Sequence, residues 1–232
     1  MNADIHPPDM SLSFGLAFVG GYCDAAGFLL AKTFTGHITG SLVLGAITMA
    51  ARDWRGALAH FSSTACFLTG VPLSVLIARF ASVWPSWPML GIAMGIEIIL
   101  IVASYLALAF HRASAVEIFI VCLSLALGLQ NGAFRRTGGI SVHTTYLTGM
   151  ITDLIANKAE NVTFQMTPRR TTALDPKIGL LWGLWAVFVL GAAAGAVAVF
   201  HFNAAGILGA AFVLLAMIVR NSLVALRTQP AN

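Results

Sequence analysis

The sequence predicts an all-α integral membrane protein, and three observations support this fold class. First, 58% of the 232 residues are hydrophobic and only 9% are charged, whereas about a quarter of the residues in a soluble domain are charged. Second, six apolar runs approach or exceed the ~20 residues that a helix needs to cross a bilayer. Third, these runs are continuous rather than alternating, which favours helices over the strands of a membrane barrel.

Each long apolar run is predicted to form one transmembrane helix. The runs cover residues 11–30, 56–80, 89–110, 115–134, 178–200 and 204–226. Trp84 and Trp87 stand beside prolines between two of the runs, as expected for anchors at a membrane–water interface. The first run is expected to be retained, because residues 1–10 lack the Lys or Arg of a signal peptide. We expect one transmembrane domain over residues 1–232.

Two shorter and more polar segments, residues 35–51 and 141–156, interrupt the series. They have 17 and 16 residues, which is the lower edge of spanning length. They carry His37 and Thr39 in the first segment and His143 and Thr148 in the second. Such segments are tolerated at membrane depth only where protein or a water-filled cavity shields them. We therefore expect short or re-entrant helices here.

The sequence also predicts an internal duplication. The motif GYCDAAGF around Asp24 and the motif GLQNGAF around Asn131 are each followed by a Thr-Gly pair, 15 and 17 positions later. Placing Asp24 on Asn131 also superposes the glycines three residues earlier. Each motif then continues as a polar short segment and two long apolar runs. The predicted halves are residues 11–112 and 115–227, with a central site between them, as in many secondary transporters.

The number of spans stays open at this point. If both short segments cross, there are eight spans and the repeats are parallel; if both are re-entrant, there are six spans and the repeats are inverted. Either arrangement places nine Lys and Arg residues on the side of the N-terminus and four on the other. The positive-inside rule therefore predicts cytoplasmic termini in both cases.

Polar residues inside the apolar runs are the candidates for a binding site. A carboxylate at membrane depth costs at least ~2.5–3.5 kcal/mol on insertion scales, and such residues usually face the bundle interior. The repeat places the amides of Gln130 and Asn131 at the depth that matches Asp24. The predicted substrate-binding residues are Asp24, Thr39, Gly40, Gln130, Asn131, Thr148 and Gly149. The alternative is that Asp24 only joins helices through hydrogen bonds.

Glycine spacing supports a second interpretation of the Thr-Gly motifs. Glycine lets backbones approach closely, and threonine offers a hydroxyl to a substrate or to free carbonyls. Small residues four apart, however, also mark tight helix crossings. Five glycine pairs have this spacing: Gly36 and Gly40, Gly91 and Gly95, Gly128 and Gly132, Gly179 and Gly183, Gly191 and Gly195. The sequence does not decide between substrate binding and packing.

Four residues are candidates for proton linkage: Asp24, Glu97, His37 and His143. Glu97 lies near the middle of a long apolar run, where it is either a proton-carrying site or a structural hydrogen-bonding group. Histidine can act as a proton relay or pH sensor.

Several classes of protein are not expected. The sequence lacks the usual catalytic motifs, such as Gly-x-Ser-x-Gly and His-Glu-x-x-His, so we predict no enzyme and no catalytic residues. The three cysteines lie in apolar runs without paired spacing, so no disulfide, metal site or cofactor is expected. The net charge of +4 comes from short loops, which indicates membrane orientation rather than nucleic acid. The expected partners are the lipid bilayer, an unknown small solute or ion, and further copies of the chain.

The motifs also resemble those of a known family. Gly-Tyr-x-Asp-Ala followed by Thr-Gly, and a later Gln-Asn followed by Thr-Thr-Tyr-x-Thr-Gly, are similar to the pattern of the YoaK family of bacterial membrane proteins of unknown function. The resemblance covers nearly the whole chain; Ser41 departs from it, where asparagine is expected. It implies a six-span inner-membrane protein and supplies no substrate.

Two functions follow as hypotheses. The first is a small-solute transporter or channel with a polar site at the interface of the two repeats. The second is a non-transporting scaffold or partner subunit whose polar motifs serve helix packing.

Overall fold

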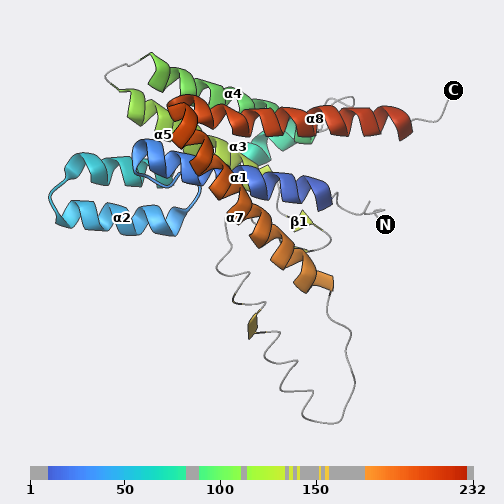
Figure 1. Ribbon diagram of the computed structural model, residues 1–232, viewed down its shortest axis with the longest axis horizontal. Coiled ribbons are helices and arrows are strands. Elements are labelled where there is room, and N and C mark those ends of the chain that lie inside the picture. Colours follow the sequence, from blue (N-terminus) through green and yellow to red (C-terminus); the bar gives the residue numbers. More distant parts are fainter. Residues whose placement is uncertain are drawn as a thin grey trace, which may run out of the picture.

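The computed structural model describes residues 10–81, 89–110, 114–133, 136–137, 140–141, 152, 155–156 and 176–228. Its helices in chain order are α1 (Met10–Ala31), α2 (Ile38–Ala50), α3 (Trp54–Ala81), α4 (Met89–Ala109), α5 (Ala115–Ala133), α7 (Pro176–Phe202), the 3-10 helix η1 (Asn203–Ile207) and α8 (Leu208–Thr228) (Figure 1). Two two-residue strands, β1 (Arg136–Thr137) and β2 (Ile140–Ser141), pair in antiparallel fashion. The predicted all-α membrane fold is confirmed.

The last predicted span begins later than expected, at Leu208 instead of residue 204. Residues 203–207 form η1, in which the chain turns between α7 and α8. Asn203 has a φ of 50°, a left-handed conformation that asparagine adopts more readily than most residues. The Tyr22 hydroxyl of α1 donates a hydrogen bond to the Gly206 carbonyl and so fixes this corner.

Five stretches of the described helices are long and apolar enough to cross a membrane. The last of them, residues 179–223, has 45 residues, which as one straight helix would measure about 67 Å, roughly twice the thickness of the hydrocarbon core. It contains α7 and α8, which meet at a sharp angle at η1 (Figure 1). The protein is therefore a multi-pass membrane protein, and the part of the chain that the structure describes has six long helices.

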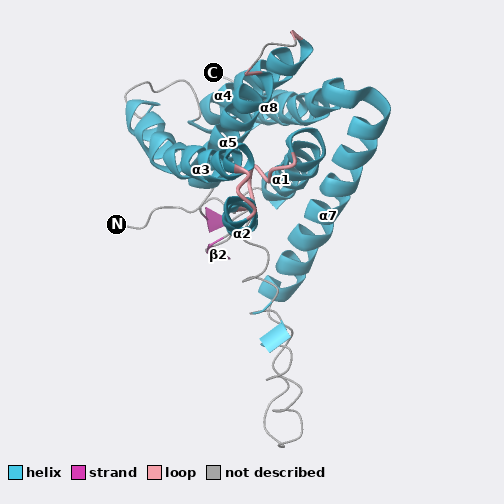
Figure 2. Cartoon of the chain, turned by 90° about the vertical axis from the view of Figure 1, so that its left-hand side faces the viewer, coloured by secondary structure: helices cyan, strands magenta, loops and turns pink. Residues whose placement is uncertain are grey.

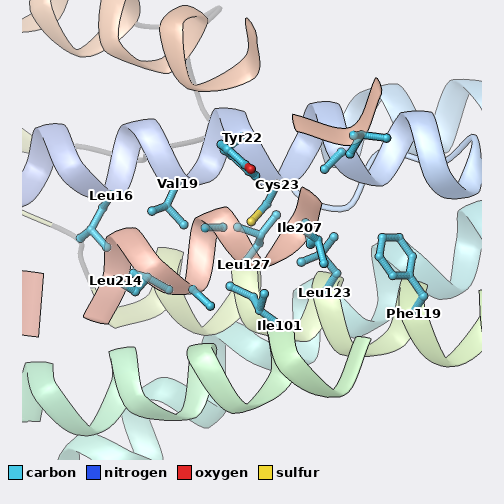
Figure 3. Packing of buried hydrophobic residues seen from close by; sticks show 14 of the residues in the cluster. Leu16, Val19, Tyr22, Cys23, Ile101, Phe119, Leu123, Leu127, Ile207 and Leu214 are labelled. Carbon is cyan, nitrogen blue, oxygen red and sulfur yellow. The ribbon is translucent and has the colours of Figure 1, made fainter. Parts of the chain in front are cut away.

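The long helices lie in two layers (Figure 2). One layer holds α3, α5, α1 and α7 in this spatial order, and α4 and α8 cover it on one face. The core lies between the layers and is built from large apolar side chains; Figure 3 shows Cys23 of α1 directed toward Leu127 of α5 and Ile207 of η1. Ile101 of α4 reaches the same cluster.

The short helix α2 lies against the opposite face of the α3–α5–α1 layer (Figure 2). It has 13 residues, or about 20 Å, so it is too short to cross a bilayer. It begins three residues after the predicted start because residues 32–37 form a loop that turns back from the end of α1. Both α1 and α2 then end on the side where α3 begins (Figure 1), so α2 does not add a span. The second short segment lies outside the described residues except at 141, 152 and 155–156.

The crossing of α1 and α7 is formed by glycine. A Cβ atom on Gly21 would overlap the carbonyl oxygen of Phe188, and one on Gly191 would overlap the carbonyl oxygen of Phe18. The two helices therefore touch through their backbones, which only glycine permits.

The crossing of α3 and α5 has the same construction. A Cβ on Gly128 would overlap the carbonyl oxygen of Phe67, and one on Gly70 would lie 2.7 Å from the carbonyl oxygen of Leu125. In both pairs the helices run in the same direction (Figure 1).

The two crossings match residue by residue under the predicted repeat. The first helix of each predicted half packs on the second long helix of the other half, and α1 and α5 run in opposite directions (Figure 1). The matching positions are Gly21 with Gly128 and Phe18 with Leu125, each 107 apart like Asp24 and Asn131, and Phe67 with Phe188 and Gly70 with Gly191, each 121 apart.

Candidate functional site

The loop of residues 32–37 lies at the middle of the bundle's depth. The Ser63 hydroxyl of α3 bonds the Phe34 carbonyl at 2.7 Å and lies 2.8 Å from the Ser124 hydroxyl. Ser124 is the central residue of α5, nine residues from each end. A non-helical stretch of backbone therefore stands halfway along a membrane-spanning helix.

Asp24 supports this loop from α1. Its side chain is 5% exposed, and Oδ1 accepts hydrogen bonds from the backbone N–H groups of Thr35 at 3.0 Å and Gly36 at 2.7 Å. The chain leaves the helix at Lys32, which has a φ of 55°, so the loop amides have no helical acceptor. Because the bilayer interior offers no water, the carboxylate supplies what the backbone lacks. This is the hydrogen-bonding role that the sequence offered as the alternative.

Three serines complete the attachment of the loop. The Phe34 carbonyl accepts from the hydroxyls of Ser41 of α2 and Ser63 of α3, each at 2.7 Å, and the Ser63 and Ser124 hydroxyls are hydrogen-bonded. We call Asp24, residues 34–36 and the three serines the loop network. Four helices thus hold one short loop.

Sequence reasoning missed the serines as functional residues. Ser63 and Ser124 occur singly in apolar runs, and many such serines bond only their own helix; Ser62 and Ser104 in this chain do so. From the sequence, Ser41 was named only because it departs from the asparagine of the family pattern.

The amides of α5 bind elsewhere. Gln130 Nε2 donates to the Leu16 carbonyl of α1 at 2.8 Å, and Asn131 Nδ2 donates to the Leu127 carbonyl of its own helix at 2.9 Å. Leu16 and Asp24 are eight residues apart on α1, or about 12 Å along its axis. The structure therefore does not bring the acid and the amides together. Because α1 and α5 run in opposite directions, matching positions fall at different depths.

The Thr-Gly pair of the first half lies in the first turn of α2. The Thr39 side chain is exposed on the described chain, while a Cβ on Gly40 would meet the rings of His37 and Phe34. His37 is the N-cap residue and makes no side-chain capping bond. The first turn of α2 thus presents one hydroxyl outward beside the loop network. The predicted residues of the second pair, Thr148 and Gly149, and also His143, lie outside the described residues.

The glycine pairs divide between the two interpretations. Gly128, Gly132, Gly191 and Gly195 meet the backbone of a neighbouring helix, so packing explains them. A Cβ on Gly91, Gly95 or Gly179 would meet no atom of the described residues within 4 Å.

Glu97 of α4 is the second buried acid. Its side chain is 1% exposed, between the equally buried Met94 and Ile101 one turn away on either side. In the described part of the chain its Oε1 atom has no hydrogen-bond partner. Cys23 of α1 interacts electrostatically with both Glu97 and Asp24.

No group of three or more His, Cys, Asp or Glu side chains that could hold a metal ion occurs among the described residues. The described ion pair, Arg55 with Glu117 at 2.8 Å, is solvent-exposed at one end of the bundle. The buried polar side chains of the described residues are two carboxyl groups, two amides, the imidazole of His60 and hydroxyls.

Comparison with known proteins agrees with the family resemblance of the motifs. The family described as "Protein of unknown function (DUF1275)" matches residues 12–220. The protein named "UPF0700 transmembrane protein YoaK" from Bacillus subtilis (strain 168) is 26% identical over 181 residues, which cover 75% of this chain and 79% of that protein. No solved structure matches the chain. The predicted resemblance to the YoaK family is confirmed.

Proposed function

The chain belongs to the DUF1275 family of proteins of unknown function, and we propose that it is a small-solute transporter of the cell inner membrane with cytoplasmic termini. The observation that carries this proposal is the loop network: a non-helical loop at the midpoint of α5, held by side chains from α1, α2, α3 and α5. We assign it no enzymatic activity.

Membrane proteins accept irregular backbone at this depth where it lines a cavity or is buried in protein. Secondary transporters break helices near the bilayer midplane and present polar groups and helix ends to the solute there. In this chain α2 begins at the loop, with Thr39 and Gly40 in its first turn. We place the solute beside this turn, with Asp24 as the residue that positions the loop.

The matching crossings support the duplication on which this function draws. Two equivalent contacts between oppositely directed halves are what an inverted repeat produces, and inverted repeats are common among transporters. We propose that Asn131 is the counterpart of Asp24 in the second half of the chain. Thr148 and Gly149 would then form the counterpart of Thr39 and Gly40, and Gln130 would join the second half to α1.

The scaffold hypothesis is the second candidate. The Asp24 carboxylate and the loop serines are occupied by structural hydrogen bonds, and four glycines serve packing. Under this hypothesis the exposed Thr39 faces lipid or another copy of the chain, and no water reaches it.

Cysteine accessibility separates the two functions without knowledge of the solute. Cys23, Cys66 and Cys122 are first replaced by alanine, and Thr39→Cys is introduced. The protein is reconstituted in vesicles and treated with a membrane-impermeant methanethiosulfonate, which reacts with hydrated thiolates. A transporter predicts reaction at Thr39→Cys, whereas a scaffold predicts none.

Two control positions calibrate the labelling. Arg52→Cys lies in the exposed turn between α2 and α3 and should react rapidly. Leu190→Cys lies on the apolar outer face of α7, where Leu190 is exposed, and should stay unreacted because lipid surrounds it.

A further inference from the structure

The two buried acids differ in what their oxygens do. Asp24 Oδ1 accepts two backbone hydrogen bonds, so this carboxyl group has a structural use. Glu97 Oε1 is buried and accepts none from the described residues. A carboxyl group that merely joined helices would carry such a bond, and a side chain that merely filled space would be better apolar. Within the described part of the chain, the Oε1 atom of Glu97 therefore makes no hydrogen bond that would offset the cost of its burial.

Among the described residues, no cationic side chain pairs with Glu97. On α1, Cys23 interacts with Glu97, and Asp24 interacts with Cys23; neither side chain is cationic. In residues 118–133 of α5, the one titratable side chain is that of Cys122, and it interacts with Cys66 of α3. Neither η1 nor residues 208–219 of α8 contain a titratable side chain, and Arg220 beyond them bonds Ser11. On α3, His60 interacts with Asp53, Arg55 pairs with Glu117, and Arg79 is exposed in the last turn.

An ionised carboxylate in such a place is much more costly than the neutral acid. The conformation described here therefore holds Glu97 with its proton. Of the other candidates for proton linkage, Asp24 is bound to the loop, and His37 lies half-buried beside the Phe34 ring. Glu97 is the acid that is free to change its charge without dismantling a described hydrogen bond.

We propose that Glu97 is the proton-binding site through which solute movement is coupled to a proton gradient. The proposal rests on the transport function proposed above and adds its coupling ion. When a change of conformation admits water to the core, the O–H bond of the carboxylic acid breaks, the electron pair stays on the carboxylate and the proton passes to a water molecule. Reprotonation from the other side of the membrane returns the buried neutral acid.

Infrared spectroscopy tests the proton directly. The variant Glu117→Gln/Glu160→Gln leaves Glu97 as the remaining glutamate, so a heavy-isotope carboxyl label in glutamate identifies its C=O band. The expected result in lipid vesicles is a protonated-acid band at neutral pH that shifts with the label and disappears reversibly as the pH is raised. The band should remain in Asp24→Asn and be lost in Glu97→Gln.

Two results would overturn the assignment. One is the absence of any labelled protonated-acid band in the folded protein. The other is a band that persists unchanged until the protein unfolds, since this would make Glu97 a fixed structural acid.

The labelling rate of Thr39→Cys then tests the coupling. It should change over the pH interval in which the Glu97 band disappears, and Glu97→Gln should abolish this change. A rate that ignores the titration would overturn proton coupling and leave the transport function standing. No reaction at any pH would overturn the transport function, and the coupling with it.

Discussion

The backbone N–H of Gly36 donates a 2.7 Å hydrogen bond to the carboxylate of Asp24, twelve residues earlier on α1. This bond turns the chain back into the bundle after α1 and lets α2 begin at the level of the middle of α5. Asp24, which the sequence predicts as a buried acid, is thus the anchor of the polar region.

Removal of the Asp24 side chain should destabilise the protein strongly. Asp24→Ala leaves the N–H groups of Thr35 and Gly36 without an acceptor, at ~1–3 kcal/mol each. Asp24→Asn keeps an acceptor oxygen and should lose less. Thermal unfolding in detergent micelles measures both, with Asp53→Ala as a control that removes an exposed helix-capping bond to Gly56, worth about 1 kcal/mol. Equal stability of Asp24→Ala and wild type would contradict the anchoring role.

The two serines on the Phe34 carbonyl should act together. Ser41→Ala or Ser63→Ala alone leaves this carbonyl one donor, whereas the double variant leaves it none. We expect each single loss to cost ~0.5–1.5 kcal/mol and the double variant to cost more than their sum. A double-mutant cycle on unfolding free energies measures the excess. Strict additivity would mean that the carbonyl has another partner.

Alanine in place of glycine should destabilise both helix crossings, that of α1 with α7 and that of α3 with α5, by a similar amount. Gly21→Ala and Gly128→Ala place a methyl group against a backbone carbonyl, and overpacking of this kind costs ~1–3 kcal/mol. The control Gly95→Ala lies in the interior of α4 with nothing within 4 Å, so it should be neutral or should stabilise by up to about 1 kcal/mol. Unfolding of the three variants in the same detergent decides; a Gly128→Ala variant as stable as Gly95→Ala would refute the close crossing.

The corner between α7 and α8 should depend on Tyr22. Tyr22→Phe removes the hydroxyl that bonds the Gly206 carbonyl, and the expected loss is ~0.5–1.5 kcal/mol. Its unfolding midpoint can be compared with that of Tyr105→Phe on α4. If only the second variant loses stability, the corner is held by packing alone.

Topology follows from the shortness of α2. Cysteines introduced at Lys32 and Arg52 flank this helix and should react from the same side of the membrane, because α2 returns to the side on which α1 ends. Impermeant labelling of intact and inverted vesicles measures the side. Reaction from opposite sides would require α2 to cross and would restore the eight-span arrangement.

Apolar length and composition predicted the six long helices to within a few residues, because lipid permits little except helix at this depth. The start of α8 was misplaced because the turn depends on the left-handed conformation of Asn203 and on the distant Tyr22. Composition alone cannot indicate either.

The candidate site was predicted only in part. Asp24 was recognised as a buried acid, but its partners lie in a loop, and the partners of Ser63 and Ser124 come from other helices. The sequence predicted the amides of α5 beside Asp24 because the two repeat motifs occupy matching positions in their apolar runs. In the structure α1 and α5 run in opposite directions, so the amides and Asp24 lie apart. The sequence left open whether the two repeats are parallel or inverted.

The most direct test of the central claim is an experimental density map of the protein in a lipid nanodisc, inspected beside the first turn of α2. We predict ordered water or solute next to Thr39, continuous with the loop network and with one aqueous side of the membrane. Acyl-chain density packed against Thr39, with no water reaching the loop, would contradict a solute pathway and leave a scaffold.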